Sequence, residues 1–445
     1  MQNAMQNATQ NAVQSAPQPI APRCDVAVIG GGPSGAAAAT LLAQRGHHVQ
    51  LFERDRFPRF HIGESLIPHT FHVIERLGLL APMKSSHFTK KHSVQFVTEK
   101  GRLSEPFYFA DHDPHPRSQT WQVRRSEFDQ MLLDNARAKG VVVHEETRVL
   151  CVLFEGSRAV GVKLRTASNE EVEVRSKVVI DASGQSSLII HKLGLREWDP
   201  DLKKAAVWTY WKGAYRDSGR DEGATIVLQT QGKKGWFWYI PMHDDIVSVG
   251  VVSSSEYLFS GRASREFEDI YFEEVARCPG LQPRLQGATR CDIFRAQKEY
   301  SYRTRQGAGD GWVLVGDAFG FLDPLYSSGV LLALVSAGMA SDAVAAALDA
   351  EDTSEPRLRG WEPRYLRGMA RMRRLVCEFY DGLSFGRLVK RNPDKKGLIT
   401  DVLIGNIFNE EIDQLWPLID ALRADEARNA AAGIPEDLSA PTLLT

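Results

Sequence analysis

Several features that mark other classes of protein are scarce or missing in this chain. Its five cysteines are odd in number and contain no C-x-x-C pair, so neither a disulfide framework nor a metal site is expected. The net charge of −2 gives no electrostatic reason to bind nucleic acid or a membrane surface. No apolar run reaches membrane-spanning length without charged or polar interruptions. We therefore expect a cytoplasmic protein that does not need a metal.

The start of the chain also lacks the signature of a targeting segment. Residues 1–23 repeat Gln-Asn-Ala and have no basic start followed by an apolar stretch. We expect a disordered tail there, not a signal peptide. The remaining residues are numerous enough, with 43% apolar residues in the whole chain, to bury a large core.

The strongest positive signal is a glycine-rich turn between a strand and a helix. Residues 24–30 form a short apolar run typical of a buried strand. The turn Gly30-Gly31-Gly32-Pro33-Ser34-Gly35 follows with G-x-G-x-x-G spacing, and residues 36–45 form an alanine-rich helix. A second strand at 48–52 leads to Glu53. Together these parts predict a Rossmann-like dinucleotide-binding unit.

Each part of this unit has a mechanical role. Gly30 permits the tight turn, Gly32 lets the backbone approach a pyrophosphate, and Gly35 lets the helix pack closely on the strand. The first turn of the helix offers free N–H groups and a positive dipole end to the phosphates. Glu53 is placed to accept hydrogen bonds from a ribose.

Three later segments indicate which dinucleotide is bound. The run Asp181-Ala182-Ser183-Gly184 ends one predicted strand, and Gly316-Asp317-Ala318 ends another. Asp317 is placed to accept from a sugar-like hydroxyl. The segment 323–329 opens a long apolar helix at 330–348. Their order along the chain is similar to that of FAD-containing aromatic hydroxylases and their relatives, so FAD is favoured over NAD.

An aromatic strand is the most distinctive segment of the sequence. In Trp236-Phe237-Trp238-Tyr239-Ile240-Pro241, alternate side chains point to the same face of a strand. Trp236, Trp238 and Ile240 therefore form one bulky wall, and the residues between them face the other way. Pro241 closes the segment before the next strand, at 246–252. By itself the wall is also compatible with ordinary core packing.

Over roughly residues 24–390 the chain resembles the flavin-dependent halogenases, in the bacterial branch that acts on phenols and pyrroles. The G-E-S and W-x-W-x-I-P segments are fairly specific to that family, and the other matches are shared with flavin monooxygenases. Besides the glycine-rich turn, the matching segments are Phe57-Pro58-Arg59-Phe60-His61-Ile62-Gly63-Glu64-Ser65, Trp236–Pro241, Asp181–Gly184, Tyr300-Ser301-Tyr302, Gly316-Asp317-Ala318, Asp323-Pro324 and Ser327-Ser328-Gly329-Val330.

The resemblance implies a specific reaction. Reduced FAD and oxygen convert a bound chloride or bromide into hypohalous acid, which travels through a tunnel to a lysine beside an electron-rich aromatic substrate. In this sequence the matching lysine is Lys91, five residues before the aromatic Phe96, whereas Lys90 misses that register by one. Without the resemblance both lysines would be interpreted as ordinary solvated side chains.

The resemblance also assigns roles to other residues. Trp236 and Trp238, with Ile240 and Pro241, would separate the flavin from the substrate, so that only a small oxidant passes. The halide would lie near the backbone N–H groups of Ser328 and Gly329, where a helix start suits an anion. Arg125, at the start of a helix within 123–139, resembles an arginine that contacts FAD, with an exposed helix-start charge as the alternative.

Two chemical questions stay open at the level of sequence. A lysine can hydrogen-bond hypohalous acid as ammonium, or attack the halogen as the free amine. The second route needs burial, because a free lysine titrates near pH ~10.4. Tyr326 stands where tryptophan halogenases carry a glutamate, which favours a phenol or pyrrole that activates its own ring. The base that removes the ring proton is not identified.

The expected architecture follows from these parts. We expect an α/β fold: an FAD-binding domain of the aromatic-hydroxylase type at 24–355, with a β-rich substrate region inserted at about 85–125 and 200–305. Residues 356–445 should form a helical region covering the substrate. No second glycine-rich nucleotide fold is evident, so a separate NAD(P)H-dependent flavin reductase is the expected partner, beside a small aromatic substrate that is free or tethered to a carrier protein.

Two other functions fit part of the sequence. An FAD-dependent aromatic monooxygenase would share the flavin elements without needing Lys91 or the tryptophan wall. A flavin-binding protein without activity would not need Lys91, Trp236, Trp238 and the 323–330 segment together.

Overall fold

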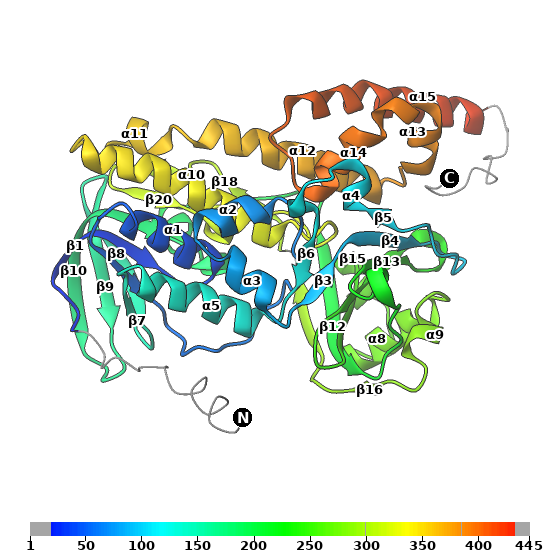
Figure 1. Ribbon diagram of the computed structural model, residues 1–445, viewed down its shortest axis with the longest axis horizontal. Coiled ribbons are helices and arrows are strands. Elements are labelled where there is room, and N and C mark those ends of the chain that lie inside the picture. The colour runs from blue at the N-terminus through cyan, green and yellow to red at the C-terminus, as the bar shows by residue number, and fades with distance from the viewer. Residues whose placement is uncertain (1–18, 299, 384, 432–445) are drawn as a thin grey trace, which may run out of the picture.

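A mainly parallel sheet forms the left half of the molecule in Figure 1. The computed structural model describes residues 19–298, 300–383 and 385–431. Residues 1–18 of the expected tail and 432–445 of the expected C-terminal region lie outside the described residues. Ala21, inside the expected tail, exchanges two hydrogen bonds with the Gln50 side chain, so the ordered chain begins before residue 24.

β1, β2 and the C-terminal end of β10 are mostly buried and rich in apolar residues, as expected for parallel strands covered by helices. β1 pairs in parallel with β10 on one side and β2 on the other. β8 and β9 extend β10 as an antiparallel meander. The strands are β19 (Ala308–Gly309), β20 (Trp312–Leu314), β10 (Glu171–Asp181), β1 (Arg23–Ile29), β2 (Val49–Phe52), β7 (Val142–His144), β8 (Arg148–Glu155) and β9 (Arg158–Arg165).

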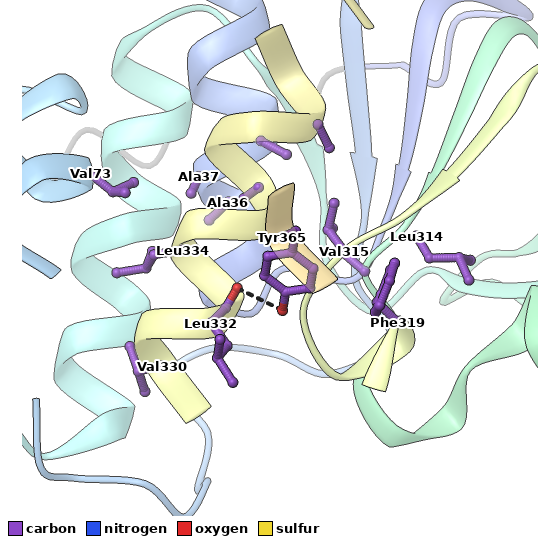
Figure 2. Packing of buried hydrophobic residues seen from close by; sticks show 14 of the residues in the cluster. Ala36, Ala37, Val73, Leu314, Val315, Phe319, Val330, Leu332, Leu334 and Tyr365 are labelled. Carbon is purple, nitrogen blue, oxygen red and sulfur yellow. Dashed lines mark hydrogen bonds between the residues drawn. The ribbon is translucent and has the colours of Figure 1, made fainter. Parts of the chain in front are cut away.

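Three helices pack together beside this sheet: α1 (Pro33–Ala43), α5 (Arg125–Ala138) and α10 (Gly329–Asp349). The small side chains of α1 are buried and allow α10 to approach closely. Figure 2 shows this contact, with the Tyr365 hydroxyl donating to the Leu332 carbonyl at 3.3 Å. Among the described helices, α10 alone has the length and composition to cross a membrane, and 72% of that segment is buried inside the protein.

A second sheet occupies the lower right of Figure 1. One of its faces contributes Trp236 and Trp238 to the main core, and the other contributes Phe237 and Tyr239 to a second core beneath α8 (Phe267–Ala276). In sheet order the strands are β16 (Thr289–Arg290), β12 (Lys204–Lys212), β15 (Ile246–Ser254), β14 (Gly235–Pro241), β13 (Thr225–Gln229), β4 (Ser93–Val97) and β5 (Phe107–Tyr108), with β17 (Arg295–Lys298) also paired to β12.

Two small sheets complete the β structure. β3 (Thr89–Lys91) pairs with β6 (Thr120–Gln122), which places Lys91 opposite Thr120. β18 (Tyr302–Thr304) lies between β11 (Arg196–Trp198) and β21 (Gly320–Phe321).

The C-terminal part is helical and lies along the top of the molecule in Figure 1. α14 contacts α4, the short helix that follows β5. These helices are α11 (Glu355–Arg359), α12 (Glu362–Tyr380), α13 (Phe385–Arg391), α14 (Lys396–Ile404) and α15 (Leu415–Ala431); the other short helices are α2 (Thr70–Arg76), α3 (Leu80–Ser85), α4 (Phe109–His112), α6 (Leu188–Leu193), α7 (Ser255–Phe259), α8 (Phe267–Ala276) and α9 (Gln282–Leu285).

Candidate functional site

A cavity of about 880 Å³ is lined by residues of both large sheets. Its lining includes the glycine-rich turn and the ends of β1 and β2, and also one face of β12, β13 and β14. The predicted nucleotide-binding residues and the predicted tryptophan wall therefore border the same space.

The glycine-rich turn has little room for side chains at two positions. Gly30 has φ of +98°, and a Cβ there would lie 2.6 Å from the Ala182 carbonyl oxygen. A Cβ on Gly35 would lie 1.9 Å from the Gly30 carbonyl oxygen, so the helix can pack here only without a side chain. Gly32, Pro33 and Ser34 line the cavity at the first turn of α1, whose amide groups have no partner within the helix.

Two carboxylates of the cavity wall can accept hydrogen bonds from a ligand. Glu53 accepts from the Gly31 amide at 2.7 Å and the Asp55 amide at 2.9 Å, which leaves further lone pairs at the cavity. The Asp317 carboxylate accepts no hydrogen bond from the described part of the chain, and burial raises its pKa to about 6. An unpartnered carboxylate beside a helix N-terminus fits the sugar-like hydroxyls and pyrophosphate of FAD.

Arg125 is the first residue of α5 and is buried, which excludes the alternative of an exposed helix-start charge. Its Nε and Nη2 donate to Asp129 at 2.8 and 3.0 Å, and its Nη1 donates to the Ile62 carbonyl at 2.5 Å. These bonds fix the guanidinium group at the cavity wall.

The aromatic strand β14 behaves as the alternation predicts for five of its residues. Trp236, Trp238 and Ile240 line the cavity, and the residues between them belong to the second core. Pro241 does not line the cavity: as an odd-numbered residue of the strand it falls on the opposite face from Trp236, Trp238 and Ile240. Sequence reasoning missed Trp208 of β12, whose ring lies 6.2 Å from that of Trp238.

Hydrogen bonds through Tyr380 connect the tryptophan wall to the C-terminal helix α12. The Trp236 indole donates to the Tyr380 hydroxyl at 3.1 Å, and that hydroxyl donates to the buried Asp323 carboxylate at 3.1 Å. Burial raises the pKa of Asp323 to about 7. No local sequence pattern marks Tyr380, because both of its partners, Trp236 and Asp323, are distant in the sequence.

The turn before α10 has the geometry expected of an anion site. Ser327 adopts φ of +55°, Ser328 caps the helix and Gly329 is its first residue. Within the described ranges the amides of Ser328 and Gly329 donate no hydrogen bond. Gly329 and Ser327 line the cavity, whereas Ser328 is buried behind them. Tyr326, just ahead, is buried with an unpartnered hydroxyl.

Lys91 is almost completely buried, with 2% of its surface exposed, whereas the neighbouring Lys90 is exposed. Its Nζ donates to Ser65 Oγ at 2.8 Å and to the Leu66 carbonyl at 3.1 Å, and lies 5.7 Å from the Phe109 ring centre. Burial lowers its pKa to about 7. Lys91 does not line the cavity itself, but Ser65 does.

One group of potential metal ligands occurs among the described residues. Ligand atoms of His87, Glu127 and His243 lie within 4.8 Å of one another. Both imidazoles hydrogen-bond to Glu127, at 2.7 and 3.1 Å, and Arg124 donates to the same carboxylate at 3.2 Å. The negative charge of Glu127 is therefore balanced by Arg124 without a metal ion.

The fold and the cavity define a flavin-dependent oxidoreductase, and residues 25–192 match the family model for FAD dependent oxidoreductases. Residues 111–383 match the tryptophan halogenase family model. The chain belongs to this family and is an FAD-dependent halogenase, which confirms the predicted fold class and overturns the monooxygenase alternative. Its reaction uses FAD, a halide and oxygen.

Three relatives illustrate this membership. The chain is 36% identical over 359 residues to a tryptophan 2-halogenase of Chondromyces crocatus, covering 80% of this chain and 67% of the relative. It is 32% identical to a 1H-pyrrole-2-carbonyl-(peptidyl-carrier protein) brominase of Pseudoalteromonas luteoviolacea, covering 87% and 93%. The solved structure of the flavin-dependent brominase Bmp2 matches with a TM-score of 0.80 at 28% identity, covering 92% of this chain and 100% of that chain.

Proposed function

We propose that this halogenase transfers chlorine or bromine to an electron-rich phenol or pyrrole through Lys91. The observation that carries the proposal is a buried amine with a pKa of about 7, separated by one hydroxyl side chain from a cavity that fits FAD. Reduced FAD bound in this cavity would supply the electrons for the reduction of oxygen, and the resulting oxidant would convert halide into hypohalous acid.

We assign separate parts of the cavity to the halide and to the barrier between flavin and substrate. The free amides of Ser328 and Gly329, at the positive end of a helix of 21 residues, would hold the halide. Trp236, Trp238 and Ile240 line the cavity from one face of β14 and would form a wall too bulky for an aromatic ring to pass. Only a small oxidant can then reach Lys91, which keeps the substrate ring away from the flavin.

Hydrogen-bond geometry supports the free amine as the reactive form of Lys91. A neutral amine has two N–H groups and one lone pair. The two acceptors, Ser65 Oγ and the Leu66 carbonyl, match two N–H groups, and the described residues offer no third acceptor for an ammonium. The lone pair remains available to attack the halogen, so we favour transfer through a halogenated amine.

The substrate class is argued from Tyr326 and from the relatives. Tyr326 replaces the glutamate found in tryptophan halogenases, so the ring must supply its own activation. The brominase of Pseudoalteromonas luteoviolacea acts, by its name, on a carrier-bound pyrrole. We therefore propose a phenol or pyrrole as substrate, with free and carrier-tethered forms distinguished by experiment.

We further propose a cytoplasmic location and a separate NAD(P)H-dependent flavin reductase as partner. All five cysteines are free, as in reducing compartments. The sequence has a single glycine-rich nucleotide-binding turn, and this turn lines the cavity that we assign to FAD. No second turn of this kind is left to bind NADH.

A direct assay tests the proposal. The protein is incubated with FAD, a flavin reductase, NADH, oxygen and either chloride or bromide, together with phenols and pyrroles presented free or on a carrier protein. Product masses that increase by replacement of hydrogen with halogen support the proposal. Halide-independent addition of oxygen, or halogenation of an unactivated ring only, would contradict it.

The rate of halogen transfer should depend on pH through Lys91. Because its pKa is lowered from 10.5 to about 7, the reactive free amine becomes populated as the pH rises through 7. Below this pKa we expect the transfer rate to fall about tenfold per pH unit. The measurement is product formation from pH 5.5 to 9, with total oxidant determined in parallel by a small halogen acceptor. A transfer rate that decreases as the pH rises through 7 would instead favour the ammonium route.

Replacing Tyr380 with phenylalanine should loosen the wall. The variant leaves the Trp236 indole and the Asp323 carboxylate without their shared partner, at a cost of about 1–3 kcal/mol for a buried unsatisfied group. We expect a lower melting temperature and about threefold or more loss of product per FAD oxidised. Tyr257→Phe is the matched control, since its hydroxyl bonds to Arg277 far from the cavity wall. An equal yield of halogenated product per FAD oxidised in Tyr380→Phe and Tyr257→Phe would argue against a role for Tyr380.

A further inference from the structure

Lys91 is joined to the cavity by a chain of hydroxyl groups. Its Nζ lies 2.8 Å from Ser65 Oγ, and Ser65 Oγ lies 2.9 Å from Thr225 Oγ1. Gln122 Nε2 lies 2.8 Å from the same Thr225 oxygen. Ser65 and Thr225 both line the cavity, whereas Lys91 does not. The two hydroxyls are therefore the polar connection between the buried amine and the cavity.

The donors and acceptors in this chain can be assigned. Gln122 Nε2 also donates to the Gly223 carbonyl at 2.9 Å, which fixes the amide so that its nitrogen faces Thr225. Thr225 Oγ1 thus accepts from Gln122. Either hydroxyl can donate in the Ser65–Thr225 bond; when Ser65, which accepts from Lys91, donates to Thr225, the Thr225 hydrogen is left for the cavity. In that arrangement the N–H of Lys91 and the O–H groups of Ser65 and Thr225 all point from the amine towards the cavity.

This order matters because Lys91 is shielded from water. Only 2% of its surface is exposed, and Ser65 and Thr225 are each 4% exposed. An ammonium must lose a proton before its lone pair can attack a halogen, and a buried ammonium cannot give that proton directly to bulk water. Hydroxyl groups can pass a proton because each one both donates and accepts.

We propose that Ser65 and Thr225 are positioning residues that relay the proton of the Lys91 ammonium to water in the cavity. One N–H bond of the ammonium breaks and Ser65 Oγ receives the proton, while the Ser65 hydrogen passes to Thr225 and the Thr225 hydrogen passes to water. The nitrogen keeps the electron pair, so nothing is oxidised or reduced. This inference rests on the proposed function of Lys91.

The relay is tested with variants that change one hydroxyl. Thr225→Val keeps the shape of the side chain and removes the last hydroxyl of the relay. We expect the rate of halogen transfer to fall about tenfold or more. FAD affinity and the rate of oxidant formation should stay within about twofold of the parent protein, and the melting temperature within a few degrees. Thr225→Ser restores the hydroxyl and should recover most of the rate. Thr209→Val, which removes a buried hydroxyl of β12 outside the cavity, is the matched control.

Ser65→Ala removes both the first hydroxyl of the relay and a hydrogen-bond acceptor of Lys91, so it should change the pH profile as well as the rate. Loss of an acceptor disfavours the ammonium, so the acid limb of the pH–rate profile should move to lower pH while the maximal rate falls. The pKa of Lys91 can be followed independently by NMR of ¹³C-labelled lysine, with the Lys91 signal assigned from Lys91→Arg. The expected result is a lower pKa in Ser65→Ala than in the parent protein.

The outcomes separate this inference from the proposed function. If Lys91→Ala is inactive but Thr225→Val transfers halogen at the parent rate with an unchanged pH profile, the relay is wrong and the role of Lys91 stands. If Lys91→Ala still halogenates the substrate, the proposed role of Lys91 is wrong, and the relay is wrong with it. Failure of Thr225→Ser to recover the rate would also overturn the relay, because both side chains carry the hydroxyl.

Discussion

Lys91→Ala should lose halogenated product by about a thousandfold or more, since removal of a nucleophile leaves only the contributions of binding. FAD binding and halide-dependent oxidant formation should persist, because Lys91 does not line the cavity. The expected signature is therefore oxidant that reaches a small halogen acceptor while the aromatic substrate remains unmodified. Product mass and acceptor halogenation are measured in the same reaction.

Lys91→Arg and Lys91→Met separate the possible reasons for that loss. Methionine keeps most of the buried volume without an amine, and arginine keeps the charge and the hydrogen bonds but is a poor nucleophile. We expect both to be inactive if the amine is halogenated. An active Lys91→Arg would show that hydrogen bonding to hypohalous acid suffices. Normal turnover by Lys91→Met would remove Lys91 from the mechanism.

Gly35→Ala should abolish FAD binding or folding. A Cβ at this position would lie 1.9 Å from the Gly30 carbonyl oxygen, so either α1 must move away from β1 or the turn must change shape. Each change would displace the amides that we propose face the pyrophosphate, and small-to-large changes in packed sites typically cost about 1–3 kcal/mol or more. Flavin fluorescence titration measures the affinity, and thermal unfolding measures stability.

Gly360→Ala is the control for this substitution. Gly360 has ordinary helical φ, and a Cβ there would meet nothing closer than 3.9 Å. We expect its FAD affinity and melting temperature to match those of the parent protein. Parent-like FAD affinity in Gly35→Ala would mean that the first turn of α1 is not where the pyrophosphate binds.

The parts of the site that follow from local patterns were predictable. The glycine spacing predicted a turn whose Gly30 has φ of +98°, and the period of two predicted which side chains of β14 line the cavity. The same period places Pro241 on the other face, although a family motif had grouped it with the barrier. Helix α10 begins at Gly329, one residue before the predicted start.

Other parts depend on residues that meet only in the folded chain. Trp236 and Tyr380 are 144 residues apart, and Ser65 and Thr225 are 160 residues apart, so no local pattern could pair them. The sequence alone determined the glycine-rich turn and the side chains of β14 that share a face, since these depend on backbone conformation and strand period. The tertiary structure decided that Lys91 is buried with a pKa of about 7, because burial depends on every element packed around a side chain.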